Sequence, residues 1–166
     1  MKLHAPWRAA GAALLALLLS ACATAPKPPA EATAEMGPWA GRLALTVQDK
    51  PNESFAAGFE LKGNPQRGEL ELLSPLGGTL GLLQWQPGKA TLRSSSRTTE
   101  YESLEALVTQ VAGTSIPVAA LFDWLRGVAT PVPGWQPDLT QLAQGRLRAV
   151  RTDPQPQADL RVLLER

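Results

Sequence analysis

The side chain with the most reactive chemistry in this 166-residue chain is the thiol of Cys22, the sole cysteine. It closes a Leu-Ser-Ala-Cys stretch that follows an apolar run over residues 9–19. Lys2 and Arg8 place positive charge ahead of that run. This order of charge, apolar run and small residues is typical of a secretory signal peptide. The run is too short to be a membrane-spanning helix.

The four residues ending at Cys22 resemble the bacterial lipobox, in which the thiol is diacylated and the leader is cleaved just before it. We therefore expect a leader over residues 1–21 and a mature protein that begins at Cys22, acylated at its new amino terminus. This covalent lipid is the one non-protein group that we expect, with no other cofactor. The alternative is an ordinary signal peptide with a chance cysteine.

The mature chain lacks the side chains that most enzyme chemistry needs. His4, the sole histidine, leaves with the leader, and the Cys22 thiol is consumed by lipid. A serine or cysteine nucleophile with a histidine partner is therefore excluded, as is a histidine or cysteine metal site. The sequence holds neither a Gly-x-x-x-x-Gly-Lys-Ser/Thr loop nor, after the leader, a Ser-x-x-Lys pair. We predict that the protein is not an enzyme and binds no metal.

Two carboxylates leave one alternative open, in which the protein is a hydrolase. Glu69 and Glu71 stand two apart on a predicted strand, so they share a face and could form an acid/base pair. Solvated side chains on an exposed strand face are the simpler interpretation.

Charge is balanced in the mature chain. The sequence has 16 Lys and Arg, of which Lys2 and Arg8 lie in the leader, leaving 14 against 15 Asp and Glu. No basic cluster stands out along the chain, so neither nucleic acid nor anionic headgroups are predicted as partners. Arg42 is interpreted as a solvated surface arginine, with a role at the rim or toward a partner as the alternative.

The chain divides into a tether and one folded domain. Residues 22–38 are rich in Ala, Pro, Thr and Glu, so they cannot bury apolar area and should form a lipid-anchored flexible tether. Fully extended, this tether reaches on the order of 50 Å at about 3.3 Å per residue. The folded domain is predicted over residues 39–166.

Period-two alternation of apolar and polar residues dominates the first half of this domain, and short turns separate the alternating segments. This pattern predicts an antiparallel meander. The predicted strands cover residues 39–47, 54–61, 69–72, 80–85 and 90–94.

The period then changes to that of a helix. Ser103 is a suitable N-cap for a helix that Gly113 ends, and Pro117 can open a second helix that Gly127 closes. Residues 131–137 are predicted to be irregular. Two final strands are predicted over residues 145–152 and 160–165.

The predicted fold is mainly β with two helices, in which one antiparallel sheet curls into an incomplete barrel. The helices must bury an apolar stripe, and the inner face of the sheet is the available partner. Such an arrangement gives either a solid core or a closable cavity, and the residue pattern does not distinguish the two.

Several segments resemble the LolB family of outer-membrane lipoprotein receptors. They are Trp-Ala-Gly-Arg-Leu-Ala-Leu at residues 39–45, Leu-Leu-Ser-Pro-Leu-Gly at 72–77, Gly-Thr-Ser-Ile-Pro-Val at 113–118 with Leu-Phe-Asp-Trp-Leu-Arg-Gly at 121–127, and Gly-Trp at 134–135. The Gly-Trp pair resembles the start of a later strand in the family, and the order and spacing of all these segments agree with the family as well. Over residues 138–166 the resemblance is poor.

The resemblance implies an incomplete antiparallel barrel with a helical lid over an apolar cavity. The function it implies is to take lipoproteins from a periplasmic, LolA-like carrier and insert them into the inner leaflet of the outer membrane. The implied protein is a monomer, lipid-anchored in the outer membrane and facing the periplasm. Ala23, rather than Asp, follows the lipidated cysteine, which is compatible with export to that membrane. The alternative is a non-catalytic structural or accessory envelope lipoprotein of similar fold.

The resemblance also implies two kinds of site residue. Pro75, Leu76 and Gly77 match the family's protruding loop, whose leucine starts membrane insertion; the alternative is a turn leucine that covers the barrel end. Candidates for the lining of the acyl cavity are apolar, and each has ordinary core packing as its alternative. These candidates are Leu43, Leu45, Phe55, Phe59, Leu70, Leu72, Leu82, Trp85, Leu121, Trp124 and Leu125.

Overall fold

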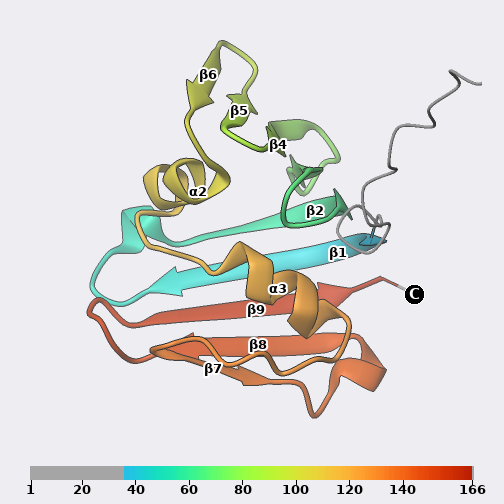
Figure 1. The fold of residues 1–166 in the computed structure, drawn as a ribbon, viewed down its shortest axis with the longest axis vertical. Coiled ribbons are helices and arrows are strands. Elements are labelled where there is room, and N and C mark those ends of the chain that lie inside the picture. The colour runs from blue at the N-terminus through green and yellow to red at the C-terminus, as the bar shows by residue number, and fades with distance from the viewer. Residues whose placement is uncertain (1–35, 166) are drawn as a thin grey trace, which may run out of the picture. The chain divides into compact units, whose positions relative to one another are not determined.

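The computed structural model describes residues 36–165, which form one antiparallel sheet of nine strands and two α-helices (Figure 1). The first six strands follow one another as a meander, and a short 3-10 turn, η2 (Pro51–Glu53), lies between the first two. These strands are β1 (Met36–Val47), β2 (Phe55–Gly63), β3 (Gly68–Leu73), β4 (Thr79–Gln86), β5 (Lys89–Arg93) and β6 (Thr98–Tyr101).

Both helices come between β6 and the last three strands. The elements in chain order are α2 (Leu104–Ala112), α3 (Val118–Leu125), β7 (Trp135–Asp138), η3 (Leu142–Gln144), β8 (Arg146–Arg151) and β9 (Ala158–Leu164). No helix within residues 36–165 is both long and apolar enough to cross a bilayer.

The last strand returns to the first. Strand β9 pairs with β1, which gives the order β6-β5-β4-β3-β2-β1-β9-β8-β7, and every neighbouring pair is antiparallel. Strands β6 and β7 remain the two edges, so the sheet is open and unclosed. This confirms the predicted fold class, since an open antiparallel sheet with two helices is consistent with an incomplete barrel.

The helix ends follow the predicted signals. The Ser103 Oγ accepts a hydrogen bond of 3.1 Å from the backbone N–H of Ala106, and Gly113 ends α2 in the left-handed conformation with φ 63°. Pro117 precedes α3, and Gly127 closes the following turn by donating its N–H to the Trp124 carbonyl. The short loop between the helices therefore forces both onto the same sheet.

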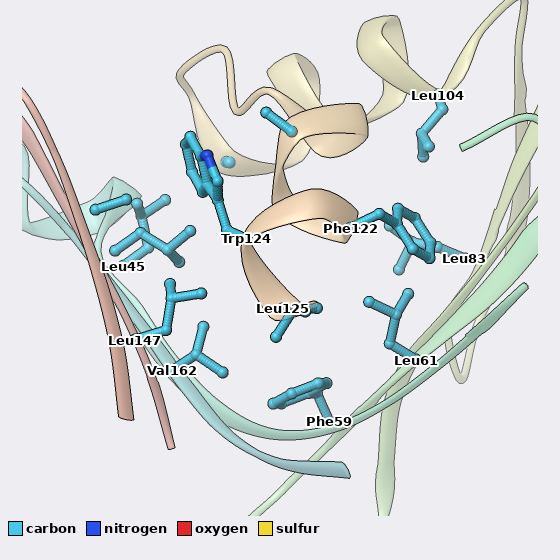
Figure 2. Close-up of a cluster of buried hydrophobic side chains, with 14 of the residues drawn as sticks. Leu45, Phe59, Leu61, Leu83, Leu104, Phe122, Trp124, Leu125, Leu147 and Val162 are labelled. Carbon is cyan, nitrogen blue, oxygen red and sulfur yellow. The ribbon is translucent and has the colours of Figure 1, made fainter. Parts of the chain in front are cut away.

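Helix α3 packs into the apolar face of the sheet through aromatic side chains. Phe122, Trp124 and Leu125 point toward the strands (Figure 2). The Phe122 ring meets those of Trp39 and Trp85 edge-on, with centroid distances of 5.7 and 6.3 Å. Such T-shaped contacts add to the free energy gained by burial alone.

Two edge strands were missed by the sequence pattern. Strand β6 has no apolar alternation, and β7 lies where residues 131–137 were predicted to be irregular. Pro137 lies within β7, where it is tolerated because an edge strand can lack one N–H donor. Strand β1 also begins at Met36, ahead of the predicted domain start at residue 39. The leader, Cys22 and the tether up to residue 35 lie outside the described residues.

Candidate functional site

An apolar hollow of about 90 Å³ lies between the sheet and the two helices. Every residue that lines it is apolar, so it offers a guest no directional hydrogen bond. The sheet contributes Leu43, Phe55, Phe59, Leu61, Leu70, Leu72, Leu83, Trp85, Leu160 and Val162. The helical segment contributes Leu104, Val108, Val111, Ala112, Ile116, Val118, Leu121 and Leu125.

The hollow approaches the surface beside α2. Val111, in the last turn of α2, lines the hollow and is still 40% exposed, and Val108 one turn earlier is half-buried. On the same helix Leu107 is fully buried and does not line the hollow. Helix α2 therefore presents one residue row to the packed core and a neighbouring row to the rim of the hollow.

Most of the predicted lining residues are brought together. Eight of them face the hollow: Leu43, Phe55, Phe59, Leu70, Leu72, Trp85, Leu121 and Leu125. Leu45, Leu82 and Trp124 do not, and each is placed elsewhere for a structural reason.

Leu45 and Trp124 belong to the filled part of the interior. Leu45 is 1% exposed and sits opposite Leu160 of β9. Trp124 is fully buried, its indole N–H donates to the Thr130 carbonyl at 2.9 Å, and its ring lies 6.3 Å from that of Trp135. Both are core residues in this structure.

Leu82 corrects a prediction about strand orientation. It pairs with Glu71 and Arg93 on the sheet face opposite the helices. Leu83 takes the inner position instead, because consecutive strand residues point to opposite faces. The apolar run of β4 had concealed which of the two leucines points inward.

Trp85 forms a fixed wall of the hollow. Its indole N–H donates to the Asn64 carbonyl at 2.9 Å, so its polar atom is satisfied inside an apolar site. The ring covers Gly68, where an added Cβ would come within 2.4 Å of the Trp85 Cζ2. A side chain at position 68 would therefore displace this wall.

The sequence pattern missed the contribution of α2 to the lining. Residues 104, 107, 108 and 111 follow helical spacing, which predicted a buried stripe but not a partly empty space beneath part of it. Residue type alone could not reveal the hollow, because Val108 and Leu107 are equally suited to a packed core.

A second apolar feature, the loop of residues 74–78 between β3 and β4, points away from the core. Gly77 donates its N–H to the Ser74 carbonyl at 2.9 Å, and Ser74 donates its N–H to the Gly78 carbonyl at 2.8 Å. The Ser74 Oγ also accepts from the Gly78 N–H at 3.1 Å. Gly77 adopts φ +82°, which a turn accommodates best with glycine.

This hydrogen-bonded loop presents Leu76 to solvent. The side chain of Leu76 is 98% exposed, so it does not cover the barrel end. Leu80, just beyond the loop, is 52% exposed as well. An apolar side chain on a fixed, fully exposed tip has no partner within the described part of the chain.

The carboxylates considered for catalysis are engaged on the outer face of the sheet. Glu69 forms an ion pair of 2.8 Å with Lys62 and accepts a hydrogen bond from Gln84, and the hydrogen bond from Lys62 is the main cause of its lowered pKa. Glu71 accepts a hydrogen bond from Thr79. Within residues 36–165, no group of acidic, histidine or cysteine side chains is arranged to hold a metal ion.

The fold and the site together define a class: an open antiparallel half-barrel with an apolar hollow under two short helices and a projecting apolar loop. The family model described as "Outer membrane lipoprotein LolB" matches residues 38–159. The chain therefore belongs to the LolB family. The match continues beyond residue 138, where the sequence segments had resembled the family poorly.

Individual relatives agree with this assignment. The chain is 36% identical to the outer-membrane lipoprotein LolB of Bordetella petrii, over 84% of this chain and 72% of the relative. It is 35% identical to that of Chromobacterium violaceum, over 72% and 67% of the two chains. It is 32% identical to that of Chromohalobacter salexigens, over 75% and 63%.

Proposed function

We propose that this chain receives lipoproteins from a LolA-like periplasmic carrier and inserts them into the inner leaflet of the outer membrane. Membership of a family of outer-membrane lipoproteins supports the location. The dry hollow supports binding of acyl chains, and the exposed loop supports contact with a bilayer. The work is binding and transfer by a monomer, without making or breaking bonds in the cargo.

The hollow suits acyl chains because its lining is entirely apolar. Each CH₂ removed from water contributes about 0.8 kcal/mol, and no polar group has to be matched. A volume of about 90 Å³ is small for a ligand site, since pockets for small molecules span roughly 300–1,000 Å³. We therefore infer a closed form, from which the helical lid must move before an acyl chain can enter.

Helix α2 is the part of the lid best placed to move. Phe122 and Trp124 hold α3 against the sheet, with both side chains fully buried. Val108 and Val111 of α2 only rim the hollow. Outward movement of α2 would widen the hollow while the aromatic contacts of α3 persist.

Transfer must run downhill, because the sequence has no nucleotide-binding motif to drive it. Affinity for acyl chains then has to rise from carrier to receptor to bilayer. An apolar hollow that grips its guest modestly meets this requirement, since the cargo has to leave again. The lipid on Cys22 would keep the receptor at the destination membrane.

Leu76 is the group that would begin insertion. Burying a leucine side chain gains about 1.5–3 kcal/mol, which corresponds to roughly tenfold to hundredfold in membrane partitioning. Because hydrogen bonds already hold the loop, little conformational entropy is lost when Leu76 enters the bilayer. The 98% exposure of Leu76 on a hydrogen-bonded turn is the observation that carries this proposal.

The test is Leu76→Glu in an assay that follows a lipoprotein from the carrier to vesicles. Delivery to vesicles should fall at least tenfold, whereas uptake from the carrier and the thermal unfolding midpoint should stay unchanged. Val128→Glu is the matched control, because Val128 is also an exposed apolar residue, at 50%, and lies outside the loop.

Normal delivery by Leu76→Glu, or an equal loss with Val128→Glu, would contradict the role of the loop. A wild-type chain that takes up no acylated cargo from the carrier would instead favour a structural or accessory envelope lipoprotein.

A further inference from the structure

The sheet face opposite the helices carries a hollow of about 810 Å³ that the proposed function does not use. Its floor is made of small residues on β1 and β2: Ala40, Ala44, Ala56 and Gly58. Small side chains at the centre of a sheet leave room that longer ones at its edges enclose. The volume lies in the range of roughly 300–1,000 Å³ that small-molecule sites occupy.

The hollow begins at the base of the exposed loop. Pro75 and Gly77 line it, and so does Leu73, the last residue of β3. Strand register then defines a row across the outer face, in which Gly58 lies beside Leu73, Arg42 beside Gly58, Leu163 beside Arg42, and Arg146 beside Leu163. Strands are about 4.8 Å apart, so Arg42 lies about 10 Å from the loop base.

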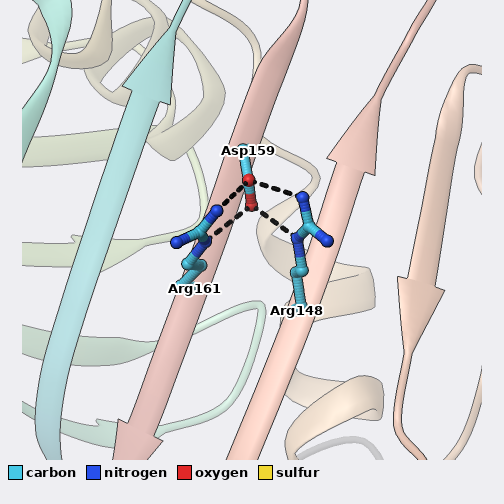
Figure 3. A network of polar contacts seen from close by, with 3 residues as sticks. All are labelled: Arg148, Asp159 and Arg161. Atoms are coloured by element: carbon cyan, nitrogen blue, oxygen red, sulfur yellow. Dashed lines mark hydrogen bonds and ion pairs between the residues drawn. The ribbon is translucent and has the colours of Figure 1, made fainter.

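A second row of arginines runs next to the first. Arg148 and Arg161 are register partners on β8 and β9, and both grip Asp159 (Figure 3). The Arg148 Nε and one terminal nitrogen donate to Asp159 at 3.0 and 2.8 Å, and Arg161 donates at 3.3 and 2.8 Å. Each guanidinium has five N–H donors, so both arginines retain N–H groups that do not bond to Asp159 and could bind a ligand.

Arg42 and Arg146 are not neutralised in this way. Both side chains are exposed, and within residues 36–165 neither forms an ion pair. The exposed Leu163 between them, at 47%, makes the row alternate between apolar and cationic groups. That alternation matches an amphiphile with a charged head.

The carboxylates of this face are engaged or lie to one side. Asp159 is held by Arg148 and Arg161, and Asp138 accepts from the Thr140 N–H and hydroxyl at 3.0 and 2.7 Å. Glu60 and Glu165 also line the hollow; they flank Ala40 in the row next to that of Arg42, on the side away from the second arginine row. Of the four arginines that line the hollow, Arg42 and Arg146 are therefore the two that form no ion pair within residues 36–165, and both lie in the row that leads from the loop.

We propose that this hollow binds the phosphate headgroup of an anionic phospholipid in the leaflet that the loop enters, with Arg42 and Arg146 as its cationic ligands. The proposal rests on the proposed function, because it takes the loop as the point of membrane contact. Guanidinium groups bind phosphate oxygens bidentately, and Leu73 and Leu163 supply apolar contact beside them. Continuity with the loop favours a lipid over an acidic protein surface.

The sequence had predicted no anionic headgroup as a partner, because its arginines are scattered along the chain. The proposed site differs from this expectation because of the fold. Residues 42, 146, 148 and 161 come from three strands that the sheet order β1-β9-β8 brings side by side.

The test uses the lipid-anchored chain in phosphatidylcholine vesicles that contain phosphatidylglycerol with a photoactivatable headgroup. Labelling should map to the outer faces of β1, β9 and β8. Arg42→Gln and Arg146→Gln should each weaken apparent binding of the probe about fivefold, the effect of one arginine near an anionic surface. Arg67→Gln is the matched control, since Arg67 is exposed in the β2–β3 turn at the opposite end of β3 from the loop.

Equal labelling of wild type and the Arg42→Gln/Arg146→Gln double variant would overturn the proposal, as would an equal loss with Arg67→Gln. Loss of cross-linking to the carrier, with lipid labelling intact, would also overturn it and assign the face to a protein partner. Normal delivery by Leu76→Glu, with arginine-dependent labelling intact, would contradict the loop's role yet support the headgroup site.

Discussion

Two parts of the same interior are built from the same kinds of residue but are filled differently. Under α3 the side chains of Phe122 and Trp124 are fully buried against other rings, and neither lines the hollow. Other side chains of α3, including Leu121 and Leu125, enclose a hollow together with α2 and the sheet, and its rim residue Val111 on α2 is 40% exposed. The helices, more than the sheet, therefore decide which part of a half-barrel is core and which is cavity.

The two regions are filled differently because of the side chains that the helices turn toward the sheet. The Phe122 ring of α3 contacts Trp39 and Trp85 of the sheet edge-on, and the Trp124 indole donates a hydrogen bond to the Thr130 carbonyl in the connection that follows the helix. The side chains that line the hollow are aliphatic on both helices, including Val108 and Ala112 of α2 and Leu121 of α3, and leave space below them. Aromatic contacts anchor α3 to the sheet, and in the proposed function α2 is the lid.

The largest expected effect comes from emptying the filled part. Trp124→Ala should lower the free energy of unfolding by about 3–5 kcal/mol, because it removes a fully buried ring and leaves a cavity. Chemical denaturation would measure the loss. Val108→Ala, which removes less side chain from the edge of an existing hollow, should cost well under half as much. Equal losses would contradict the distinction between core and cavity.

A second variant fills the hollow instead. Val108→Phe places a ring into empty space, so stability should change by less than about 1 kcal/mol while binding of a fluorescent acyl probe falls at least tenfold. Leu107→Phe is the control one residue away, where Leu107 is already fully buried. Overpacking there should cost about 1–3 kcal/mol. Unchanged probe binding by Val108→Phe would place the acyl site elsewhere.

A smaller effect should separate the two helices dynamically. Ser103→Ala removes the side-chain cap of α2 and should cost about 1 kcal/mol. Hydrogen exchange should quicken in α2 and stay unchanged in α3, since the cap acts on one helix only. Acceleration in both helices would mean that they open as one unit.

The smallest effect concerns the outer face, which neither helix covers. Hydrogen bonds from Arg148, and then Arg161, hold the pKa of Asp159 below its usual value of 3.8. A lowered folded-state pKa means that the stabilisation is present above about pH 4 and is lost as pH falls through the folded pKa. Asp159→Asn should cost about 0.5–1 kcal/mol at neutral pH and nothing at low pH. A constant difference across pH would exclude this ion-pair origin.

The sheet and the helix ends could be predicted from sequence because each rests on local chemistry. Alternation marked the central strands, and Ser103 and Gly113 marked α2. The short edge strands β6 and β7 escaped because an edge strand needs neither alternation nor every N–H.

The cavity escaped prediction for a different reason. Leu43 and Leu45 are the same residue type on the same face of β1, yet only Leu43 lines the hollow. Which of them meets a void depends on the helix that arrives above, and no local pattern encodes that. The arginine rows of the outer face could not be predicted either, because their residues come from strands that are distant in sequence and adjacent only in the folded sheet.

The most direct measurement places a photoreactive benzophenone side chain at position 85 or 124 and offers the chain an acylated cargo on its carrier. Both positions hold buried tryptophans, but only Trp85 lines the hollow. Transfer into this hollow predicts acyl labelling from position 85 and essentially none from position 124. Equal labelling from both positions, or no labelling from position 85 in a folded variant, would contradict the claim that the acyl chain enters this hollow.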